Sequence, residues 1–385
     1  MKILIIHTKY QQPGGEDTVV QQEYELLNDK NQVEILFYNN NSGIVGGIKF
    51  LFSIWNISAA KKLKKKIIEF KPDVINVHNW HYGCGPIVFR IANKMKIPVI
   101  HTLHNYRLLC PSAILLHNNK IYLNSLDQNF PWTAIFNKVY RNSLLQTFWL
   151  ATIIWFHKKI GTWKQINKYI CLTSFAVELF QQSKIGLDRN KFTVKPNFTK
   201  KTNTSIQTKR ENHFLFVGRL SEEKGIDTLL EAFKKTNYQL RIVGEGPMKN
   251  QVLEAQNEYQ NINYLGSISK EKVIEELQKT QALIFTSICY EGMPMTIIES
   301  FECKTPIITS RIGAMKSMIQ ENKNGLYFDP GNSEELKLKI EEFILKSEAE
   351  KIEMQETAFQ TFEQKYSKEK QMEYFDDICK EVINL

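Results

Sequence analysis

The chain has 385 residues, which is too long for one ordinary hydrophobic core, so two domains are expected. Its content of 43% hydrophobic and 24% charged residues is typical of a soluble globular protein, and no apolar run reaches the roughly 18 residues of a membrane-spanning helix. The net charge of +9 indicates an acidic partner, such as a phosphorylated ligand, anionic lipid or nucleic acid.

The amino terminus and the cysteines indicate the compartment. The first residues read as a strand without a long apolar segment or a cleavage site, so no secretory signal is expected. The six cysteines are scattered, lack C-x-x-C spacing and lie mostly in apolar runs, as reduced core residues do. Both features predict a cytoplasmic protein.

The first half of the chain alternates between strand and helix patterns. Strands are expected at 3–7, 33–38, 74–78, 98–103 and 169–172, with helices at 17–28, 59–69 and 86–95. Such alternation predicts right-handed β-α-β units and a parallel sheet. The segment 105–165 is longer than one crossover requires, and we interpret it as an insertion.

The second half repeats this organisation. Residues 199–212 are polar and are predicted to be a linker between domains at 1–198 and 213–361. Strands are expected near 214–217, 239–243, 262–264, 282–286 and 305–309. The predicted fold class is therefore α/β, with two doubly wound parallel-sheet domains and a ligand cleft at the carboxyl ends of the strands.

The most informative motif lies at residues 287–299. An apolar strand runs into a short polar loop, and a helix begins near Pro294, where free N–H groups can bind an anion. Glu291 lies in the loop and Glu299 lies in the helix. Carboxylates on both sides of an anion site suit a nucleotide-sugar, although a solvated loop carboxylate and a helix-surface carboxylate are the plainer interpretation of this motif alone.

A second motif covers residues 214–230. An apolar strand breaks at Gly218, Arg219 and Lys224 follow in a polar loop, and an amphipathic helix begins at Ile226. Two cations between a strand and a helix are how parallel sheets hold a phosphate group. The guanidinium binds oxygens with a planar fork, and the ammonium supplies a mobile charge.

These motifs resemble the E-x(7)-E and Val-Gly-Arg-Leu-x-x-x-Lys-Gly elements of retaining glycosyltransferases of family 4, which have the GT-B fold. The resemblance implies that Glu291 faces the transferred sugar, that Glu299 holds the ribose, and that Arg219 and Lys224 neutralise the donor diphosphate. The loop and helix start between the glutamates are counted with the donor site: Gly292, Met293, Pro294, Met295 and Thr296. Met293-Pro294 replaces the common Phe-Gly, which changes the expected sugar pocket. The resemblance also implies that residues 362–385 form a helix returning to the first domain.

Further donor-site candidates are glycines that follow strands. Gly14 and Gly15 follow the first strand, where backbone N–H groups can approach a ligand closely, although a plain tight turn explains them equally. No G-x-G-x-x-G follows, which argues against a dehydrogenase. The resemblance places the nucleotide base near Gly244 and Gly246.

The histidine-rich strand ends of the first domain are the acceptor-side candidates. Residues 98–111 resemble a His-Thr-x-His-Asn stretch of bacterial capsule and O-antigen members, which implies that His104 faces the transferred sugar. His101 would point to the opposite face and is interpreted as a core histidine. His78, Asn79 and His81 end the preceding strand and are expected to contact the acceptor. A zinc site is the alternative, but the pattern lacks a convincing ligand set.

The sequence thus predicts an enzyme that moves a hexosyl group from a nucleotide-diphosphate donor to a hydroxyl of a glycan or lipid-linked glycan, with retention and without a metal ion or cofactor. Arg219, Lys224, Glu291 and His104 are the catalytic candidates. Another nucleotide-sugar enzyme such as an epimerase, a transferase for a small soluble acceptor, and a non-catalytic binding protein are the alternatives. Nucleic-acid binding is not expected, because the basic residues are dispersed and no reader motif is present.

Two segments suggest peripheral contact with the inner face of a membrane. Residues 144–156 are apolar, with tryptophans nearby and basic flanks, and residues 61–66 form a cationic cluster. Plain core burial explains the first segment equally well, and the solvated face of a helix explains the second.

Overall fold

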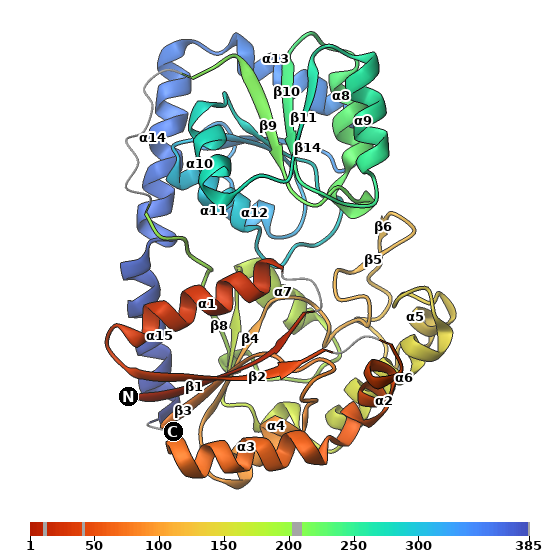
Figure 1. Ribbon diagram of the computed structural model, residues 1–385, viewed down its shortest axis with the longest axis vertical. Coiled ribbons are helices and arrows are strands. Elements are labelled where there is room, and N and C mark those ends of the chain that lie inside the picture. The colour runs from red at the N-terminus through yellow and green to blue at the C-terminus, as the bar shows by residue number, and fades with distance from the viewer. Residues whose placement is uncertain (11–13, 41–42, 202–209, 384–385) are drawn as a thin grey trace. The chain divides into compact units, whose positions relative to one another are not determined.

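A computed structural model of the chain describes residues 1–10, 14–40, 43–201 and 210–383. The chain divides into two compact units (Figure 1). Unit 1 comprises Met1–Leu115, Tyr122–Asn197 and Glu369–Leu385, and unit 2 comprises Leu116–Ile121 and Phe198–Lys368. Residues 202–209 of the predicted linker lie outside the described residues.

Unit 1 is built on a six-stranded parallel sheet with the order β2-β1-β3-β4-β7-β8. Strands β3 and β4 are buried along their whole length, which explains why they read as continuous apolar runs. The strands are β1 Lys2–Lys9, β2 Gln32–Asn39, β3 Val74–Asn79, β4 Val99–Leu103, β7 Lys168–Cys171 and β8 Phe192–Val194.

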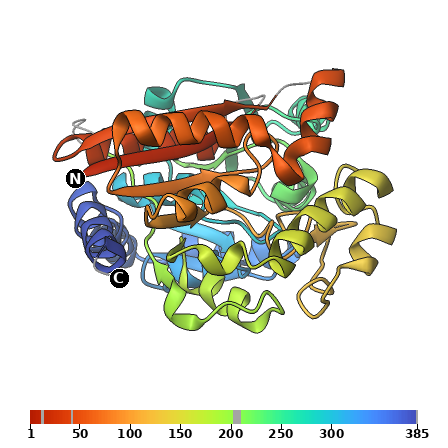
Figure 2. The same ribbon diagram turned by 90° about the horizontal axis from the view of Figure 1, so that it is seen from below.

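Helices cover both faces of this sheet. In Figure 1, α1 and α7 lie on one side of it and α3 and α4 on the other, where Figure 2 shows them in front. Polar side chains cap several of these helices: Asn56 accepts a hydrogen bond from the Ala59 N–H, and Ser143 accepts one from Gln146. The helices are α1 Gly15–Asn28, α2 Gly43–Phe52, α3 Ile57–Phe70, α4 Ile87–Lys94, α5 Trp132–Phe136, α6 Leu144–Lys159, α7 Ser174–Gln182 and α15 Lys368–Ile383. A short antiparallel hairpin, β5 Leu116–His117 with β6 Lys120–Ile121, lies within the predicted insertion.

The last helix, α15, packs on unit 1. Phe375 of α15 is fully buried, the Lys195 ammonium lies 5.7 Å from the centre of its ring, and Lys168 pairs with Glu381. This confirms the predicted return of a C-terminal helix to the first domain, although that helix begins at Lys368 and residue 362 belongs to the preceding helix, α14.

Unit 2 contains a second six-stranded parallel sheet with the order β11-β10-β9-β12-β13-β14. Its strands are β9 His213–Val217, β10 Gln239–Val243, β11 Ile262–Gly266, β12 Leu283–Phe285, β13 Ile307–Ser310 and β14 Gly325–Phe328. Its helices are α8 Ile226–Phe233, α9 Lys249–Glu258, α10 Lys270–Lys279, α11 Met295–Glu302, α12 Met315–Met318, α13 Ser333–Leu345 and α14 Glu348–Lys365. Phe214 and Phe216 of β9, Leu240 of β10 and Phe233 of α8 belong to one buried core. The predicted α/β fold with two parallel sheets is confirmed.

All six cysteines are buried and free, which confirms their interpretation as core thiols. In the part of the chain that the structure describes, none of the helices combines the length and the apolar character that crossing a bilayer requires.

Candidate functional site

The two motifs of unit 2 meet at the carboxyl edge of the sheet, because β9 and β12 are neighbours. Lys224 lies in a short 3₁₀ turn after β9, and Glu291 lies in the loop after β12. The Lys224 Nζ donates a hydrogen bond of 2.6 Å to Glu291 Oε1, and Ser287 Oγ donates another of 2.6 Å to the same oxygen. The fold thus brings together a cation and a carboxylate that lie 67 residues apart in the chain.

The backbone holds this pair in place. Gly225 adopts a left-handed φ of 69°, and a Cβ at this position would lie 2.1 Å from the carbonyl oxygen of Thr286. The Thr286 hydroxyl donates to the Lys224 carbonyl at 2.7 Å, and the Ile288 N–H donates to the Glu223 carbonyl at 3.0 Å. The glycine after Lys224 is therefore required sterically, because it lets the two loops touch.

Both members of the pair are charged at neutral pH. Burial alone would raise the pKa of Glu291, but the adjacent Lys224 ammonium and the hydrogen bonds lower it below its ordinary value. Burial likewise opposes the charged form of Lys224, yet Glu291 raises its pKa. The site therefore contains a fixed ammonium group, that of Lys224, which is paired with the Glu291 carboxylate.

Glu299 lies in the second turn of α11 and is largely buried. Its carboxylate is 3.1 Å from the Lys270 ammonium, and burial raises the pKa of Glu299 above its ordinary value despite that cation. Helix α11 begins at Met295, so Pro294 is the residue before the first helical position and not the first helical residue itself. Met293 is buried, whereas Gly292, Met295 and Thr296 are partly exposed.

The other glycines of unit 2 are required for loop packing. Gly244 has a φ of 143°, and a Cβ there would lie 1.8 Å from the carbonyl oxygen of Gly218. A Cβ on Gly246 would lie 2.2 Å from the carbonyl oxygen of Leu220. The loops after β9 and β10 therefore pack backbone against backbone. The Arg219 side chain on this edge is exposed.

In unit 1, Gly15 begins α1 and Gly14 precedes it, and among the described residues no atom beyond their chain neighbours and the helix's own backbone lies within 4 Å of a Cβ built on either glycine. Pro13 of the same motif lies outside the described residues. The open space on both glycines leaves the backbone at the start of α1 accessible, with Gly14 N–H donating to the Asp17 carboxylate at 3.0 Å.

A polar cluster beside this turn was not anticipated from the sequence. The Tyr10 hydroxyl donates to Glu16 at 2.8 Å, and burial raises the pKa of Glu16 to about 7 although the Tyr10 hydrogen bond and Arg107 oppose the rise. His7 lies on β1 with its Nε2 at 2.9 Å from Asp17, and burial lowers its pKa to about 4. Glu16, in the first turn of α1, is therefore a buried carboxyl group with a raised pKa, and such groups are often part of functional sites.

The candidate histidines of unit 1 occupy different positions. His104 follows β4 and is partly exposed, and its Nε2 lies 2.8 Å from His78 Nδ1. The side chains of His78, Asn79 and His81 are buried. Asn79 donates to the Thr8 carbonyl at 2.9 Å, and His81 Nε2 lies 3.1 Å from the Tyr140 hydroxyl. His101 is buried with its Nδ1 at 2.7 Å from the Val77 carbonyl, which confirms its interpretation as a core histidine.

Behind the histidines lies a buried ion pair that the sequence analysis missed. Glu23 of α1 accepts a hydrogen bond of 2.9 Å from Lys195, and both side chains are almost fully buried. One signal could have revealed Glu23, because it occupies the buried face of α1 together with Val19, Val20, Leu26 and Leu27. A carboxylate on the apolar face of a helix requires a buried partner.

Comparison with known proteins identifies the family. The model described as glycosyl transferases group 1 matches residues 197–360, and the model described as Glycosyltransferase Family 4 matches residues 28–200. The chain belongs to glycosyltransferase family 4. The uncharacterized glycosyltransferase MJ1178 of Methanocaldococcus jannaschii is 25% identical over 366 residues, which cover 91% of this chain and 90% of that protein.

Two further similarities concern parts of this family 4 glycosyltransferase and its fold. O-antigen chain mannosyltransferase C of Escherichia coli is 31% identical over 134 residues, which cover 34% of this chain and 36% of that protein. The crystal structure of Anabaena HepE in complex with UDP superposes with a TM-score of 0.69 at 15% identity, covering 99% of this chain and 100% of that one. The fold is therefore the GT-B fold of glycosyltransferases.

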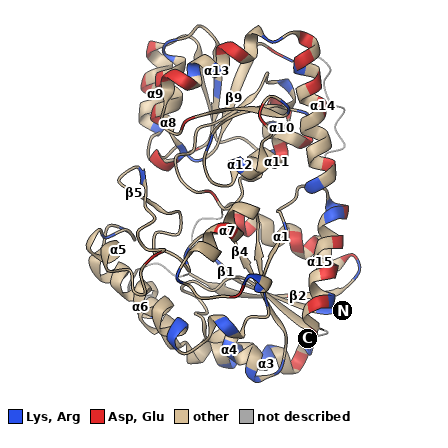
Figure 3. Cartoon of the chain, turned by 180° about the vertical axis from the view of Figure 1, so that it is seen from behind, with Lys and Arg blue, Asp and Glu red and all other residues tan. Residues whose placement is uncertain are grey.

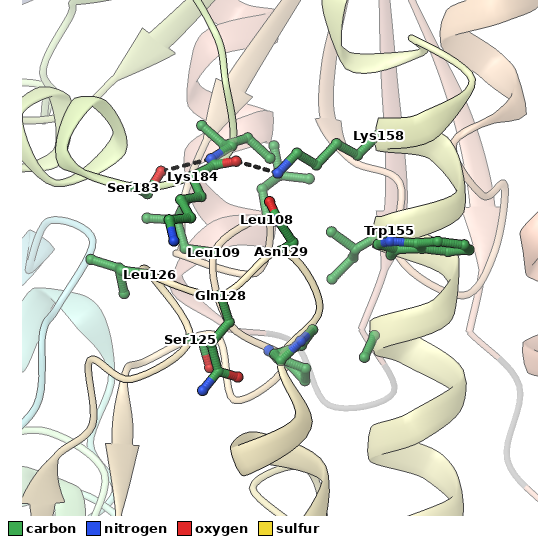
Figure 4. Close-up of a pocket in the computed structure, with 15 residues that line it drawn as sticks. Leu108, Leu109, Ser125, Leu126, Gln128, Asn129, Trp155, Lys158, Ser183 and Lys184 are labelled. Atoms are coloured by element: carbon green, nitrogen blue, oxygen red, sulfur yellow. Dashed lines mark hydrogen bonds between the residues drawn. The ribbon is translucent and has the colours of Figure 1, made fainter.

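The glycosyltransferase also has a small pocket in unit 1, between α6 and the loop residues 108–111, 125–131 and 183–185 (Figure 4). The Lys158 ammonium donates to the Lys184 carbonyl at its rim. Its volume is about 40 Å³, which suffices for water but not for a sugar ring. We therefore do not count it with the site. Its lining includes Leu108, Leu109, Ser125, Leu126, Gln128, Asn129 and Trp155.

Proposed function

We propose that this protein is a retaining glycosyltransferase that moves a hexosyl group from a nucleotide-diphosphate sugar to a hydroxyl of a glycan or lipid-linked glycan in cell-surface polysaccharide synthesis. The observation that carries the proposal is the Lys224–Glu291 pair at the carboxyl edge of the unit 2 sheet, with Glu299 in the following helix. This edge is where open α/β sheets bind their ligands. The similarity to an O-antigen mannosyltransferase supports the polysaccharide role.

The proposed mechanism is electrostatic. The bond from the anomeric carbon to the diphosphate breaks, the acceptor oxygen bonds to that carbon on the same face, and the leaving diphosphate oxygen takes the acceptor's proton. Lys224 and Arg219 stabilise the negative charge that builds on the diphosphate, in place of a divalent ion. Glu291, held by Lys224 and Ser287, orients the transferred sugar, and Glu299 accepts hydrogen bonds from the ribose hydroxyls. Unit 2 thus binds the donor. In unit 1, His104 orients the transferred sugar, and the surface around Gly14 and Gly15 supplies further donor contacts.

The nucleotide is the first property to test, by thermal denaturation with UDP, GDP, ADP and TDP, each with and without EDTA. We expect one nucleotide to raise the melting temperature without metal, and UDP is the first choice because HepE was solved with it. At about a hundredfold excess over Kd the gain is roughly 2.7 kcal/mol, or about 5 °C or more. Glu299→Ala should abolish the shift, and the exposed Glu254→Ala on α9 should keep it. No shift with any nucleotide would remove the basis of the donor assignment.

A lipid-linked acceptor is supported by an apolar surface on unit 1. The junction of α2 and α3 exposes a set of large apolar side chains, here called the α2–α3 patch: Ile48, Leu51, Phe52, Trp55 and Ile57. A second set, the α5–α6 patch, consists of Trp132, Phe136, Leu144, Leu145 and Phe148. The indole N–H of Trp149 on α6 donates to the Phe50 carbonyl on α2 at 2.9 Å, and Leu51 and Leu145 line one groove between the helices. The two patches are therefore continuous.

The charge around these patches is mostly positive. Residues 43–70 and 132–159 together contain ten lysines and arginines and one glutamate, an excess equal to the net charge of the whole chain. Figure 3 shows Lys and Arg on α3 and α6. An exposed apolar surface with a basic surround suits an anionic bilayer. Helix α6 itself buries Leu150 and Ile153, so core burial accounts for one face of residues 144–156, and its exposed face with Leu145 is the one that we assign to the membrane.

We expect the protein to co-sediment with vesicles of phosphatidylcholine and phosphatidylglycerol, and much less with phosphatidylcholine alone. Leu51→Ser with Phe52→Ser should weaken this binding by about tenfold or more, because each side chain loses up to about 1.5–3 kcal/mol of burial. Ile352→Ser on α14, an equally exposed apolar position of unit 2, is the matched control. If the protein with Leu51→Ser and Phe52→Ser binds vesicles as strongly as Ile352→Ser does, the proposed surface is contradicted.

A further inference from the structure

A buried chain of side chains connects the ion pair of unit 1 to His104. Glu23 Oε1 accepts a hydrogen bond of 2.7 Å from Asn76 Nδ2, the same amide nitrogen lies 3.0 Å from His78 Nε2, and His78 Nδ1 lies 2.8 Å from His104 Nε2. Asn76 is completely buried and His78 nearly so. His104 is the one partly exposed member of this chain, and its Nδ1 is not among the buried atoms that lack a partner.

The chemistry of the chain fixes its direction. The Thr102 hydroxyl donates to Asn76 Oδ1 at 3.0 Å, and an ionised Glu23 can only accept, so the amide nitrogen of Asn76 must face Glu23. The second N–H of that amide then points to His78. Because an amide nitrogen is not an acceptor, His78 Nε2 must accept, and its proton must reside on Nδ1.

The direction continues into His104. His78 Nδ1–H donates to His104 Nε2, so the proton of a neutral His104 resides on Nδ1, at the exposed end of the chain. Glu23 Oε1 also lies 3.3 Å from His78 Nε2, which would support the reverse direction, but the contact to Asn76 is shorter and has hydrogen-bond geometry. The two rings are nearly parallel, with an interplanar angle of 20° and centroids 5.1 Å apart, which is the arrangement of two imidazoles that meet end to end through this hydrogen bond.

The remaining electrostatic environment keeps His104 neutral. Burial lowers the pKa of His104 well below its ordinary value, although the Glu23 carboxylate opposes this. Glu23 is itself neutralised by Lys195 at 2.9 Å. His104 is therefore a hydrogen-bond donor through Nδ1, and its charge does not change near neutral pH.

We propose that Asn76 and His78 are positioning residues that hold His104 in the tautomer with Nδ1 protonated, so that His104 presents a fixed N–H donor to the substrate. The nature of the substrate rests on the proposed function: there, the N–H binds a hydroxyl of the transferred sugar. The tautomer itself does not depend on that function, because it follows from contacts inside unit 1.

The test is the ¹⁵N spectrum of the full chain labelled with ¹⁵N-histidine, since protonated and unprotonated ring nitrogens differ widely in shift. His104→Gln assigns the His104 signals among the eight histidines. In the wild-type protein we expect a protonated Nδ1 and an unprotonated Nε2 on His104 from pH 6 to 8. A protonated Nε2 on His104, or a mixture of tautomers, would overturn the proposal.

Variants test the positioning roles. Asn76→Leu with Thr102→Val removes the amide donor, so His78 Nε2–H should turn to Glu23 and the His104 tautomer should invert. His78→Gln keeps an N–H donor toward His104 and should keep the tautomer, whereas His78→Leu should lose it. We expect kcat to fall about tenfold where the tautomer is lost and to be largely preserved in His78→Gln.

Each outcome separates this inference from the proposed function. A correct tautomer without sugar transfer would leave the chain intact and remove the transferase assignment. An unchanged tautomer in the double variant Asn76→Leu with Thr102→Val would overturn the role of Asn76, whatever the activity. Glu381→Gln, which removes a charge from the Lys168 pair of the same unit, is the control and should leave both readouts unchanged.

Discussion

Replacing Lys224 with alanine is expected to lower kcat/KM for the nucleotide-sugar by about a hundred- to a thousandfold. Removing one preorganised donor to a developing negative charge costs roughly 3–4 kcal/mol in enzymes that rely on electrostatic stabilisation. Lys224 is 23% exposed and lies against the 16%-exposed Glu291, so water cannot fully replace its charge. The measurement is the initial rate of nucleotide release at several donor concentrations.

The control for this variant is Lys235→Ala. Lys235 pairs with Glu334 on the surface of the same unit, where such pairs contribute little. We expect turnover close to that of the wild type. Melting temperatures of both variants separate lost stability from lost catalysis, because Lys224→Ala also leaves the Glu291 carboxylate with one cation fewer. Equal turnover of Lys224→Ala and the wild type would exclude the role assigned to this lysine.

The Glu23–Lys195 pair is expected to give the largest effect on stability. Glu23→Leu alone leaves the Lys195 ammonium buried without its carboxylate, and Lys195→Met alone leaves the reverse, so each should destabilise unit 1 by about 3–5 kcal/mol. The double variant should cost clearly less than the sum, because no uncompensated charge remains. Urea unfolding, followed by tryptophan fluorescence, measures the free energy of unfolding of the wild type, the two single variants and the double variant.

The comparison pair is Lys168 with Glu381, in which the carboxylate is 52% exposed. Glu381→Ala should cost less than about 1 kcal/mol. Additive single effects at Glu23 and Lys195 would show that the two charges do not stabilise each other in the folded chain.

The same pair predicts an acid dependence. Burial alone would raise the pKa of Glu23, but the Lys195 ammonium holds it well below its ordinary value. A lowered carboxyl pKa stabilises the folded state at pH values above the ordinary value, near 4.5, and this contribution is lost as the pH falls below it. Below about pH 4.5 the wild type should therefore lose stability relative to the double variant, which lacks this carboxylate.

Strands with strong patterns were predictable. The runs at 3–7 and 74–78 are rich in Ile, Leu and Val, and both became inner strands of the unit 1 sheet. The edge strands β8 Phe192–Val194 and β14 Gly325–Phe328 were missed. They span only three and four residues, and a run this short is stabilised by its neighbour more than by its own pattern.

The motif residues and the buried network differ in how they can be found. Lys224 and Glu291 lie in motifs in which a strand is followed by a polar loop, and the physical rule for parallel sheets places such loops at one edge. Asn76 carries no such local signal, because its partners lie on other strands and helices, and Glu23 is marked only by its place on the apolar face of α1. The sequence supplied His78 as a candidate for acceptor contact, whereas the structure shows its imidazole enclosed between Asn76 and His104.

The sequence by itself determined the α/β class, the two parallel sheets and the donor-side motifs, because hydrophobic period and local turn chemistry act over a few residues. The tertiary structure alone decided that Lys224 and Glu291 form a pair, that Glu23 is neutralised by Lys195, and that the polar chain ends at His104. Hydrogen bonds between distant residues depend on distances of a few tenths of an ångström. Only the packed chain sets such distances.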